Sequence, residues 1–443
     1  MTNMLSKHAQ NYVVAGLGKT GLACARYFSR HNKAFRIWDT RTGYAVPETV
    51  QQEFKVPIHC GAVTNDYWTD VDVLVLSPGI APDSPAVKAA KACGVEVIGD
   101  IELFARAVTH PVLGITGSNG KTTVTLLTAH IINALGIKAV AAGNVGLPAL
   151  DSLTLENDIT VLELSSFQLE TTASLKLAAA TLLNLSADHL DRHHTLSAYA
   201  AAKQRIFNDC AVAVVNRQDG ATRPQQPVSR LIETGLCASA TDFGWNSENA
   251  VITYNGQHLL ALSDTALVGL HNVLNIQTAL ALVSVVGGDI ADAAEAVKTF
   301  KPAPHRCTKI AEVKGVSFID DSKATNIGAT QAALEGLTNT LNGRLILIAG
   351  GDAKGADLRA LTSTLADYVD TVIAIGKDGY ILSQIATEGY YVESLEAAVT
   401  KAFALAQPGD TVLLSPACAS LDMFTSYQHR AEVFYQAVKE LAA

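Results

Sequence analysis

A glycine-rich loop between an apolar run and a helical run, in residues 112–127 (VLGITGSNGKTTVTLL), restricts the fold more than any other feature of the chain. Gly120, Lys121 and Thr122 form the core of a phosphate-binding loop. Backbone N–H groups hold phosphates there, the lysine neutralises their charge, and the threonine hydroxyl can bind Mg²⁺. Ile115 stands where the strict GxxxxGK[ST] pattern has its first glycine, so an accidental match is the alternative. The strand before and the helix after favour an ATP-binding α/β domain.

A second glycine-rich turn lies in residues 12–28 (YVVAGLGKTGLACARYF), about a hundred residues earlier. Gly16, Gly18 and Gly21 follow a strand and precede a helix, as in a dinucleotide-binding turn, and Asp39 ends the next strand at the distance typical of an acid that binds ribose. NAD binding and a tight turn without any ligand are both open at this point.

Short apolar runs alternate with helical stretches along the chain, which predicts parallel sheets in α/β domains. We expect three domains: residues 1–99, Rossmann-like; residues 100–301, a P-loop ATPase-like parallel sheet; and residues 302–443, again Rossmann-like. The segment 299–310 (TFKPAPHRCTKI) carries two prolines and is typical of a linker. A helix is expected to begin near Asn272.

Composition excludes several classes of function. The net charge of −9 and the absence of a basic run argue against non-specific binding to nucleic acid. No apolar run reaches the ~18 residues of a membrane helix, and the start of the chain does not resemble a signal peptide. Seven scattered cysteines without a CxxC motif indicate reduced thiols in a cytoplasmic protein.

Polar residues at predicted strand ends of the central block are candidates for a metal site. Glu163 ends an apolar strand, where ligand sites of parallel sheets gather. In NLSADHLDRHH, the strand-end position favours His189, and the neighbouring Asp188, Asp191 and His193 are expected to be polar surface. Lys203, judged by its helix alone, is a solvated lysine.

Asn272 and Asn275 are three residues apart on one helical face, where they could contact a purine or cap the helix. In the third block, polar groups follow three strands of one predicted sheet. Lysines and hydroxyls there suit a small anionic substrate. These groups are Asp321, Ser322, Lys323, Thr325 and Asn326, then Asp352 and Lys354, then Ser415 and Ser420.

The motifs GSNGKTT, AGNVG, ELSSFQLE, DHLDRH, AAKQRIF, HNVLN, PHR, DDSKATN, GGDAKGAD and SPACASLDMF occur in one order along nearly the whole chain. In this combination the chain resembles the Mur ligases, ATP-dependent enzymes that add amino acids to the peptidoglycan precursor. ELSSFQLE, DSKATN and SPACASLDMF are most similar to the branch that adds D-glutamate to UDP-N-acetylmuramoyl-L-alanine. The resemblance implies that the first turn binds the UDP end of the substrate, so two phosphate signatures serve two phosphate-bearing substrates.

The resemblance also implies residue roles. The catalytic residues would be Lys121, Asn144, His189 and Lys203. The ATP-binding residues would be Gly117, Ser118, Asn119, Gly120, Lys121, Thr122, Thr123, Asn272, Asn275, His305, Arg306 and Asp321. Two Mg²⁺ ions would be held by Thr122, Glu163, His189 and a carbamylated Lys203. The UDP end would meet Gly18, Lys19, Thr20, Gly21, Asp39, Thr40, Arg41, Ser77 and Gly79. D-glutamate would meet Lys323, Thr325, Lys354, Ser420 and Leu421.

The reaction implied is transfer of the ATP γ-phosphoryl group to a carboxylate, followed by attack of the amine of D-glutamate on the acyl phosphate. We expect a monomer whose domains close around this intermediate, with a hinge in residues 301–306. The alternatives are an NAD-linked dehydrogenase, a relative that extends folate with glutamate, a non-catalytic nucleotide-binding protein, and a sister Mur ligase that adds another amino acid.

Overall fold

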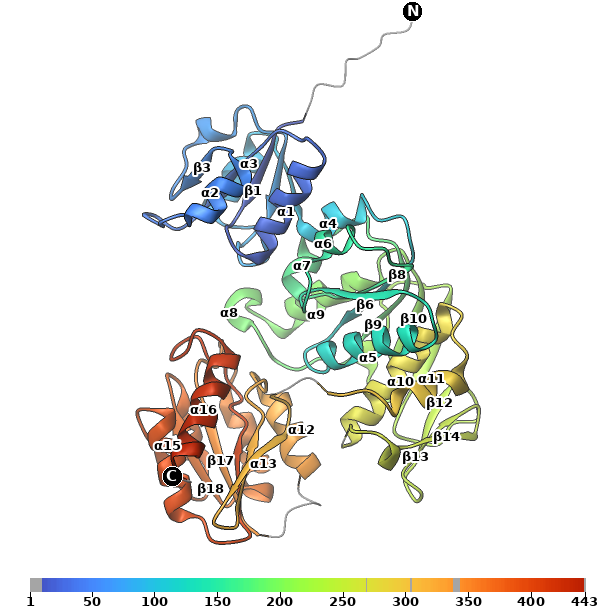
Figure 1. Ribbon diagram of the computed structural model, residues 1–443, viewed down its shortest axis with the longest axis vertical. Helices are drawn as coiled ribbons and strands as arrows, with labels where there is room; N and C mark the ends of the chain where they lie inside the picture. The colour runs from blue at the N-terminus through green and yellow to red at the C-terminus, as the bar shows by residue number, and fades with distance from the viewer. Residues whose placement is uncertain (1–9, 268, 303–304, 338–342, 442–443) are drawn as a thin grey trace, which may run out of the picture.

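The computed structural model describes residues 10–267, 269–302, 305–337 and 343–441, which form three successive α/β domains (Figure 1). The centre of the expected hinge, residues 303–304, lies outside the described residues. Parallel strands dominate all three domains, and this confirms the expected α/β architecture.

The N-terminal domain is built on a parallel sheet in the order β3-β2-β1-β4-β5. Its strands are β1 (Tyr12–Ala15), β2 (Phe35–Asp39), β3 (Ile58–Cys60), β4 (Val73–Leu76) and β5 (Glu96–Gly99), and its helices are α1 (Lys19–Arg30), α2 (Glu48–Phe54) and α3 (Pro85–Ala92), with a 3₁₀ turn at Asn65–Trp68. Strand β1 lies between β2 and β4, so the segments that follow these three strands meet at one edge of the sheet.

The central domain has a parallel sheet in the order β11-β10-β9-β6-β8-β7. Its strands are β6 (Val112–Thr116), β7 (Ala139–Gly143), β8 (Ile159–Glu163), β9 (Leu177–Leu182), β10 (Cys210–Asn216) and β11 (Arg230–Thr234). Strands β6 and β8 are buried at every position, as expected for a parallel sheet covered on both faces. The P-loop therefore follows β6, which lies between β8 and β9. Strand β8 ends at Glu163, and β9 is followed by the segment that carries Asp188.

The helices of the central domain are α4 (Asp100–Ala105), α5 (Lys121–Ala134), α6 (Ala149–Ser152), α7 (Ser166–Glu170), α8 (Leu190–His193), α9 (Leu196–Gln204), α10 (Leu270–Val285) and α11 (Ile290–Val297). Between β11 and α10 the chain forms an antiparallel sheet of β12 (Phe243–Asn246), β13 (Val251–Tyr254) and β14 (Gln257–Ala261). The sequence analysis does not identify this sheet, because its short strands lack the long apolar runs of the parallel strands.

The C-terminal domain has a mixed sheet in the order β15-β16-β20-β17-β18-β19. Its strands are β15 (Thr308–Val313), β16 (Val316–Asp320), β17 (Leu345–Gly350), β18 (Thr371–Ile375), β19 (Gly389–Tyr391) and β20 (Thr411–Leu414), and its helices are α12 (Ile327–Leu337), α13 (Thr362–Tyr368), α14 (Gly379–Ile385), α15 (Leu395–Leu405) and α16 (Tyr427–Leu441). Strand β15 pairs antiparallel to β16 at the edge, and the rest of the sheet is parallel.

The apolar cores join two of the three domains and leave the third with cores of its own. One cluster combines N-terminal residues such as Val14, Phe28 and Val75 with central residues such as Leu162 and Leu182, so these two domains share a core. The two clusters of the C-terminal domain contain residues of that domain alone within the described part of the chain. Polar side chains of the C-terminal domain, among them Lys323, Asn326 and Lys354, contact the central domain.

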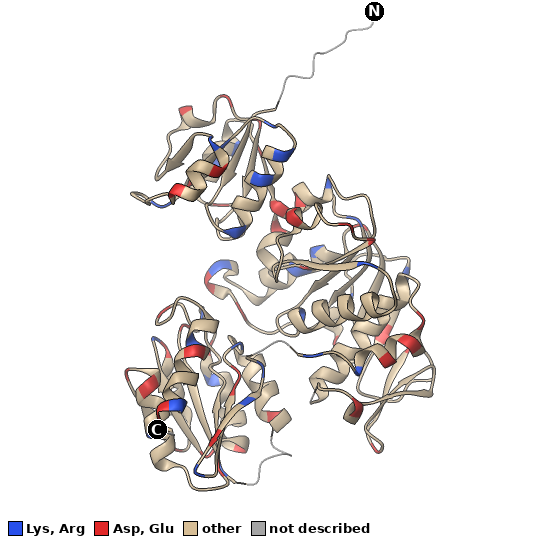
Figure 2. Ribbon diagram, in the orientation of Figure 1, with Lys and Arg blue, Asp and Glu red and all other residues tan. Residues whose placement is uncertain are grey.

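Acidic and basic residues are interspersed over all three domains (Figure 2). The seven cysteines, all within the described residues, are free. Among the described helices, none is long and apolar enough to cross a membrane.

Candidate active site

A cavity of about 730 Å³ lies where the carboxyl ends of the central strands face the C-terminal domain. It is lined by the P-loop, the segment after β9, the start of α10, the segment after β16 and the small residues of α12. Many of the predicted site residues line it: Ser118, Asn119, Gly120, Lys121, Thr122, Thr123, Asn144, Glu163, His189, Asn272, Asn275, Arg306, Asp321, Lys323 and Thr325.

The P-loop has the backbone that a phosphate cradle needs. Gly120 has a φ of +83°, and a Cβ atom there would stand 2.7 Å from the side-chain oxygen of Asn275. The Lys121 ammonium donates hydrogen bonds to the carbonyl oxygens of Gly117 (2.8 Å) and Ser118 (2.9 Å), and burial lowers its pKa. This lysine therefore satisfies two carbonyl oxygens of its own loop.

Glu163 is joined to two other predicted residues at the end of β8. The Thr122 hydroxyl donates to Glu163 Oε2 (2.8 Å), and the Asn144 amide donates to Glu163 Oε1 (2.7 Å). The carboxylate is 2% exposed, so these bonds fix its orientation in a nearly dry setting. Hydroxyl and carboxylate oxygens are ligands suited to Mg²⁺, and the metal role of Glu163 stays a prediction.

The interpretation of Lys203 as a solvated helix lysine is wrong, because its side chain is 1% exposed. Its ammonium donates to the Gly117 carbonyl (2.8 Å), directly under the P-loop, and lies 4.6 Å from the centre of the Tyr199 ring. Burial and the nearby Lys121 lower its pKa well below the usual value. The helix pattern did not predict this, since the partners of Lys203 are the Gly117 carbonyl and the Thr116 hydroxyl at the end of β6, which are distant in sequence.

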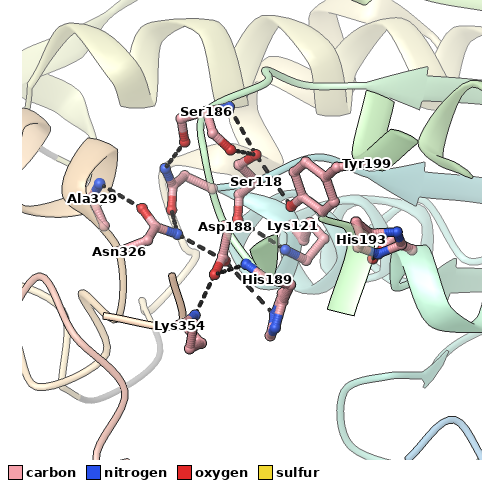
Figure 3. Close-up of polar contacts among 12 residues, drawn as sticks. Ser118, Lys121, Ser186, Asp188, His189, His193, Tyr199, Asn326, Ala329 and Lys354 are labelled. Atoms are coloured by element: carbon pink, nitrogen blue, oxygen red, sulfur yellow. Dashed lines mark hydrogen bonds and ion pairs between the residues drawn. The ribbon is translucent and has the colours of Figure 1, made fainter. Parts of the chain in front are cut away.

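Asp188 and His193 were expected to be polar surface, and this expectation is wrong, since each is 6% exposed. Asp188 is buried because the C-terminal domain covers it: the Lys354 ammonium and the Asn326 amide (3.2 Å) both bind its carboxylate (Figure 3). His193 is buried against Phe167, whose ring is 5.5 Å away, and its Nε2 lies 2.9 Å from the Ser166 hydroxyl. Asp191 is exposed, as expected.

His189 lies at the cavity wall beside Asp188, with a φ of +53°. Burial lowers its pKa to about 4, so the imidazole is neutral at neutral pH and has a lone pair available for a metal. In the described residues, no group of three His, Cys, Asp or Glu side chains forms a ready metal cluster. Any ion here would need further oxygen atoms, such as those of a nucleotide or a modified lysine.

The predicted nucleotide residues are brought together only in part. The Asn275 amide donates to the Asn272 side-chain oxygen (2.9 Å), and both face the cavity. Asp321 accepts a bond from the Ser415 hydroxyl (2.7 Å), and burial raises its pKa to about 7. His305 does not line the cavity; its ring contacts Asp320 at 2.6 Å. His271 also lies at the wall, and the sequence analysis did not identify it.

The residues predicted for D-glutamate fall into two groups. Lys323 and Thr325 line the cavity, whereas Lys354, Ser420 and Leu421 do not. Lys354 and Ser420 lie on adjoining loops, since Asp352 and Ala419 exchange backbone hydrogen bonds at 3.1 and 2.8 Å. Leu421 is 75% exposed and Ser420 is buried.

The residues predicted for the UDP end lie apart from this cavity, at the carboxyl ends of β1, β2 and β4. The backbone N–H of Leu17 donates to Asp39 Oδ2 (2.9 Å), and Arg41 forms two bonds with the same carboxylate. The burial of Ser77 Oγ leaves it without a hydrogen-bond partner in the described residues. This set comprises Gly18, Lys19, Thr20, Gly21, Asp39, Thr40, Arg41, Ser77 and Gly79.

One contact links the two regions. The Lys19 ammonium at the start of α1 donates to the carbonyl of Gly146 (3.3 Å), two residues after Asn144. The first glycine-rich turn thus faces the loop after β7, which carries Asn144, the residue whose amide binds Glu163.

Comparison with known proteins agrees with this arrangement of three domains. Residues 10–99 match the Mur ligase MurD-like N-terminal domain, residues 115–283 the Mur ligase middle domain, and residues 305–418 the Mur ligase glutamate ligase domain. The first glycine-rich turn alone left a dehydrogenase domain possible. The match over residues 10–99 identifies a Mur ligase domain there instead.

Two curated relatives are similar over nearly their whole length. The chain is 46% identical to the UDP-N-acetylmuramoylalanine–D-glutamate ligase of Methylobacillus flagellatus, with 99% of this chain and 98% of the relative covered. It is 43% identical to the enzyme of the same name from Legionella pneumophila, with 97% and 99% covered.

Solved structures show the same fold at low identity. The chain superposes on UDP-N-acetylmuramate-alanine ligase MurC of Thermotoga maritima with a TM-score of 0.62 at 18% identity, covering 98% of this chain and 100% of that one. Family models, full-length relatives and fold agree, and the chain belongs to the Mur ligase family.

Proposed function

We propose that the chain is the ligase that joins D-glutamate to UDP-N-acetylmuramoyl-L-alanine, with ATP converted to ADP and phosphate, in peptidoglycan precursor synthesis. The printed names of the relatives at 46% and 43% identity support this substrate pair. The observation that carries the proposal is the cavity in which the P-loop faces the polar strand ends of the C-terminal domain. We further infer a cytoplasmic monomer.

The chemistry explains why these parts are needed together. A carboxylate and an ammonium group do not condense in neutral water, so the carboxylate must first be activated. It attacks the γ-phosphorus of ATP, the bond from that phosphorus to the bridging oxygen breaks, and ADP leaves with the electron pair. The amine then attacks the acyl carbon, phosphate departs, and the amine loses a proton. Lys121 and Arg306 at the cavity wall supply positive charge against the repulsion between these anions.

Mg²⁺ fits the donor set at the end of β8. Thr122 and Glu163 offer oxygen atoms, His189 offers a neutral nitrogen, and Asn144 orients the Glu163 carboxylate. Bound there with ATP, two ions would neutralise phosphate charge.

Carbamylation of Lys203 is part of the proposal. A neutral amine can add to CO₂, release a proton and become a carboxylate-like ligand, and the burial that lowers the pKa of Lys203 favours the neutral form. Protein kept in ¹³C-bicarbonate should show a carbamate carbonyl signal in its NMR spectrum, and Lys203→Gln should lack it. An identical spectrum for both proteins would refute the modification.

The UDP end of the substrate is assigned to Gly18, Lys19, Thr20, Gly21, Asp39, Thr40, Arg41, Ser77 and Gly79. The contact from Lys19 to the β7 loop supports this, because it orients the first turn toward Asn144. D-glutamate is assigned to the C-terminal strand ends that carry Lys323, Thr325, Lys354, Ser420 and Leu421. Asn272, Asn275, His305, Arg306 and Asp321 would surround the nucleotide.

The test is phosphate release from MgATP and UDP-N-acetylmuramoyl-L-alanine in bicarbonate buffer. D-glutamate should support turnover, and L-glutamate, L-alanine, L-lysine and meso-diaminopimelate should not. Lys121→Gln should lower the rate by about 10³-fold. Lys138→Gln, an exposed lysine, is the matched control and should leave it unchanged. Turnover with a different amino acid would move the assignment to a sister ligase.

A further inference from the structure

Lys323 reaches from the C-terminal domain into the phosphate side of the cavity. Its ammonium donates to the Thr122 hydroxyl oxygen at 3.1 Å, across 201 positions of sequence. The same hydroxyl donates to Glu163 Oε2 at 2.8 Å. The ammonium of Lys323 therefore stands beside the group that we assign to the metal and to the γ-phosphate.

The other lysines of the site have different partners. Lys121 is turned back on the carbonyls of Gly117 and Ser118, and Lys203 lies beneath the loop on Gly117. Lys354 is bound by the Asp188 carboxylate. The loop that carries Lys354 adjoins the loop of Ser420. Lys323 is thus the lysine that the C-terminal domain places at Thr122, and Lys354 is the one it places next to the remaining D-glutamate candidates.

The loop that carries Lys323 is held firmly. The backbone N–H of Lys323 donates to the His305 carbonyl (3.3 Å), and its own carbonyl accepts from the Thr325 N–H (3.0 Å). The Tyr427 ring flanks the side chain, with its centre 5.4 Å from the ammonium. Because its loop is held in place, the side chain of Lys323 can change its hydrogen-bond partner by rotation alone.

A cation bound at Thr122 would repel the ammonium of Lys323, and the phosphoryl group that is being transferred is then an anion whose charge it can neutralise. We propose that Lys323 is a catalytic residue of the phosphoryl-transfer step, supplied by the C-terminal domain, and that D-glutamate binds through Lys354 instead. This assignment rests on the proposed ligase function. Lys323 acts as an ammonium group: it forms no covalent bond and neutralises charge while the γ-phosphoryl group passes from ATP to the substrate carboxylate and ADP leaves.

The two lysines can be separated by a single-turnover experiment. Enzyme, MgATP and UDP-N-acetylmuramoyl-L-alanine are mixed without amino acid, and the ADP formed with the acyl phosphate is measured by rapid quench. Lys323→Met should slow this burst by about 100-fold and leave the KM for D-glutamate in the residual activity nearly unchanged. Lys354→Met, the matched variant, should keep the burst and raise the KM for D-glutamate by about tenfold or more.

A binding measurement gives a readout that does not depend on turnover. In the presence of Mg²⁺, calorimetry should show that Lys323→Met reduces the affinity for a non-hydrolysable ATP analogue more than the affinity for ADP. Lys354→Met should reduce neither. Unchanged thermal unfolding of both variants would show that they are folded, and Lys323→Arg, which keeps the charge, should retain more of the burst than Lys323→Met.

The outcomes separate this assignment from the function on which it rests. A normal burst in Lys323→Met together with a raised KM for D-glutamate would overturn it and return Lys323 to the amino-acid site. Wild-type protein that produces neither a burst nor turnover with any amino acid would instead overturn the proposed function.

Discussion

Asp100 is a carboxyl group whose charge is unfavourable in the folded protein. It is 4% exposed at the start of α4, one oxygen accepts a bond from the Gln168 amide (3.1 Å), and the other has no partner in the described residues. Burial raises its pKa to about 6. The folded state therefore prefers the protonated acid, whose stabilising contribution is complete below pH ~4 and lost as the pH rises through ~6.

Asp100→Asn should therefore stabilise the protein at pH 8, by up to about 3 kcal/mol for a shift of about two pKa units. The amide keeps an oxygen for Gln168 and cannot ionise. The gain in melting temperature over wild type should shrink toward zero as the pH falls to ~4. A gain that does not depend on pH would show that the charge of Asp100 is not its cause.

Glu102, two residues away, provides the opposite case. Burial works against its charge, but hydrogen bonds from the backbone of Ala173 and Ser174, and from Arg106, prevail and lower its pKa. Glu102→Gln should therefore lower the melting temperature at pH 8, where Asp100→Asn raises it.

At the scale of elements, the turn from β1 to α1 depends on one close approach. A Cβ atom at Gly21 would stand 1.9 Å from the carbonyl oxygen of Gly16, whereas one at Gly18 would meet nothing within 4 Å. Of these two glycines, only Gly21 is required by packing. Gly18 is therefore free to serve a ligand, which is the role predicted for it.

Gly21→Ala should destabilise the protein by about 3 kcal/mol, because the backbone of the turn must move. Gly18→Ala should leave the melting temperature within about 1 °C of wild type and weaken binding of the UDP substrate, measured by calorimetry. Equal losses of stability in the two variants would contradict this division between the glycines.

The ends of strands explain which parts of the site could be predicted from the sequence. Glu163 ends β8, the P-loop follows β6, and the two strands are neighbours, so an apolar run that ends in a polar group indicated both positions. Asp188 was misjudged because its partner Lys354 lies 166 positions away in another domain. Local patterns contain no information about such a contact, and the same holds for the burial of Lys203.

At the scale of the molecule, the two domain boundaries differ in chemistry. The N-terminal and central domains share an apolar cluster and are also joined by the ion pair between Arg26 and Asp151 (2.7 Å). The central and C-terminal domains meet through polar contacts of Asp188 with Lys354 and Asn326, and of Asn326 with Asn119 (3.0 Å). Separating the first pair would expose apolar surface, whereas water can replace the polar partners of the second at small cost.

Ligands should therefore move the C-terminal domain and leave the N-terminal domain fixed on the central one. Spin labels at the exposed residues Asn249 and Glu440 report the central to C-terminal distance, and labels at Lys88 and Asn249 report the other boundary. Adding MgATP and UDP-N-acetylmuramoyl-L-alanine should shift the first distance distribution measured by pulsed EPR and leave the second unchanged. Because Asp188 binds both Lys354 and Asn326, Asp188→Ala should broaden the first distribution even without ligands. A first distribution that is unaffected by ligands and by this substitution would show that the polar boundary is as rigid as the apolar one, and closure would then have no part in protecting the acyl phosphate.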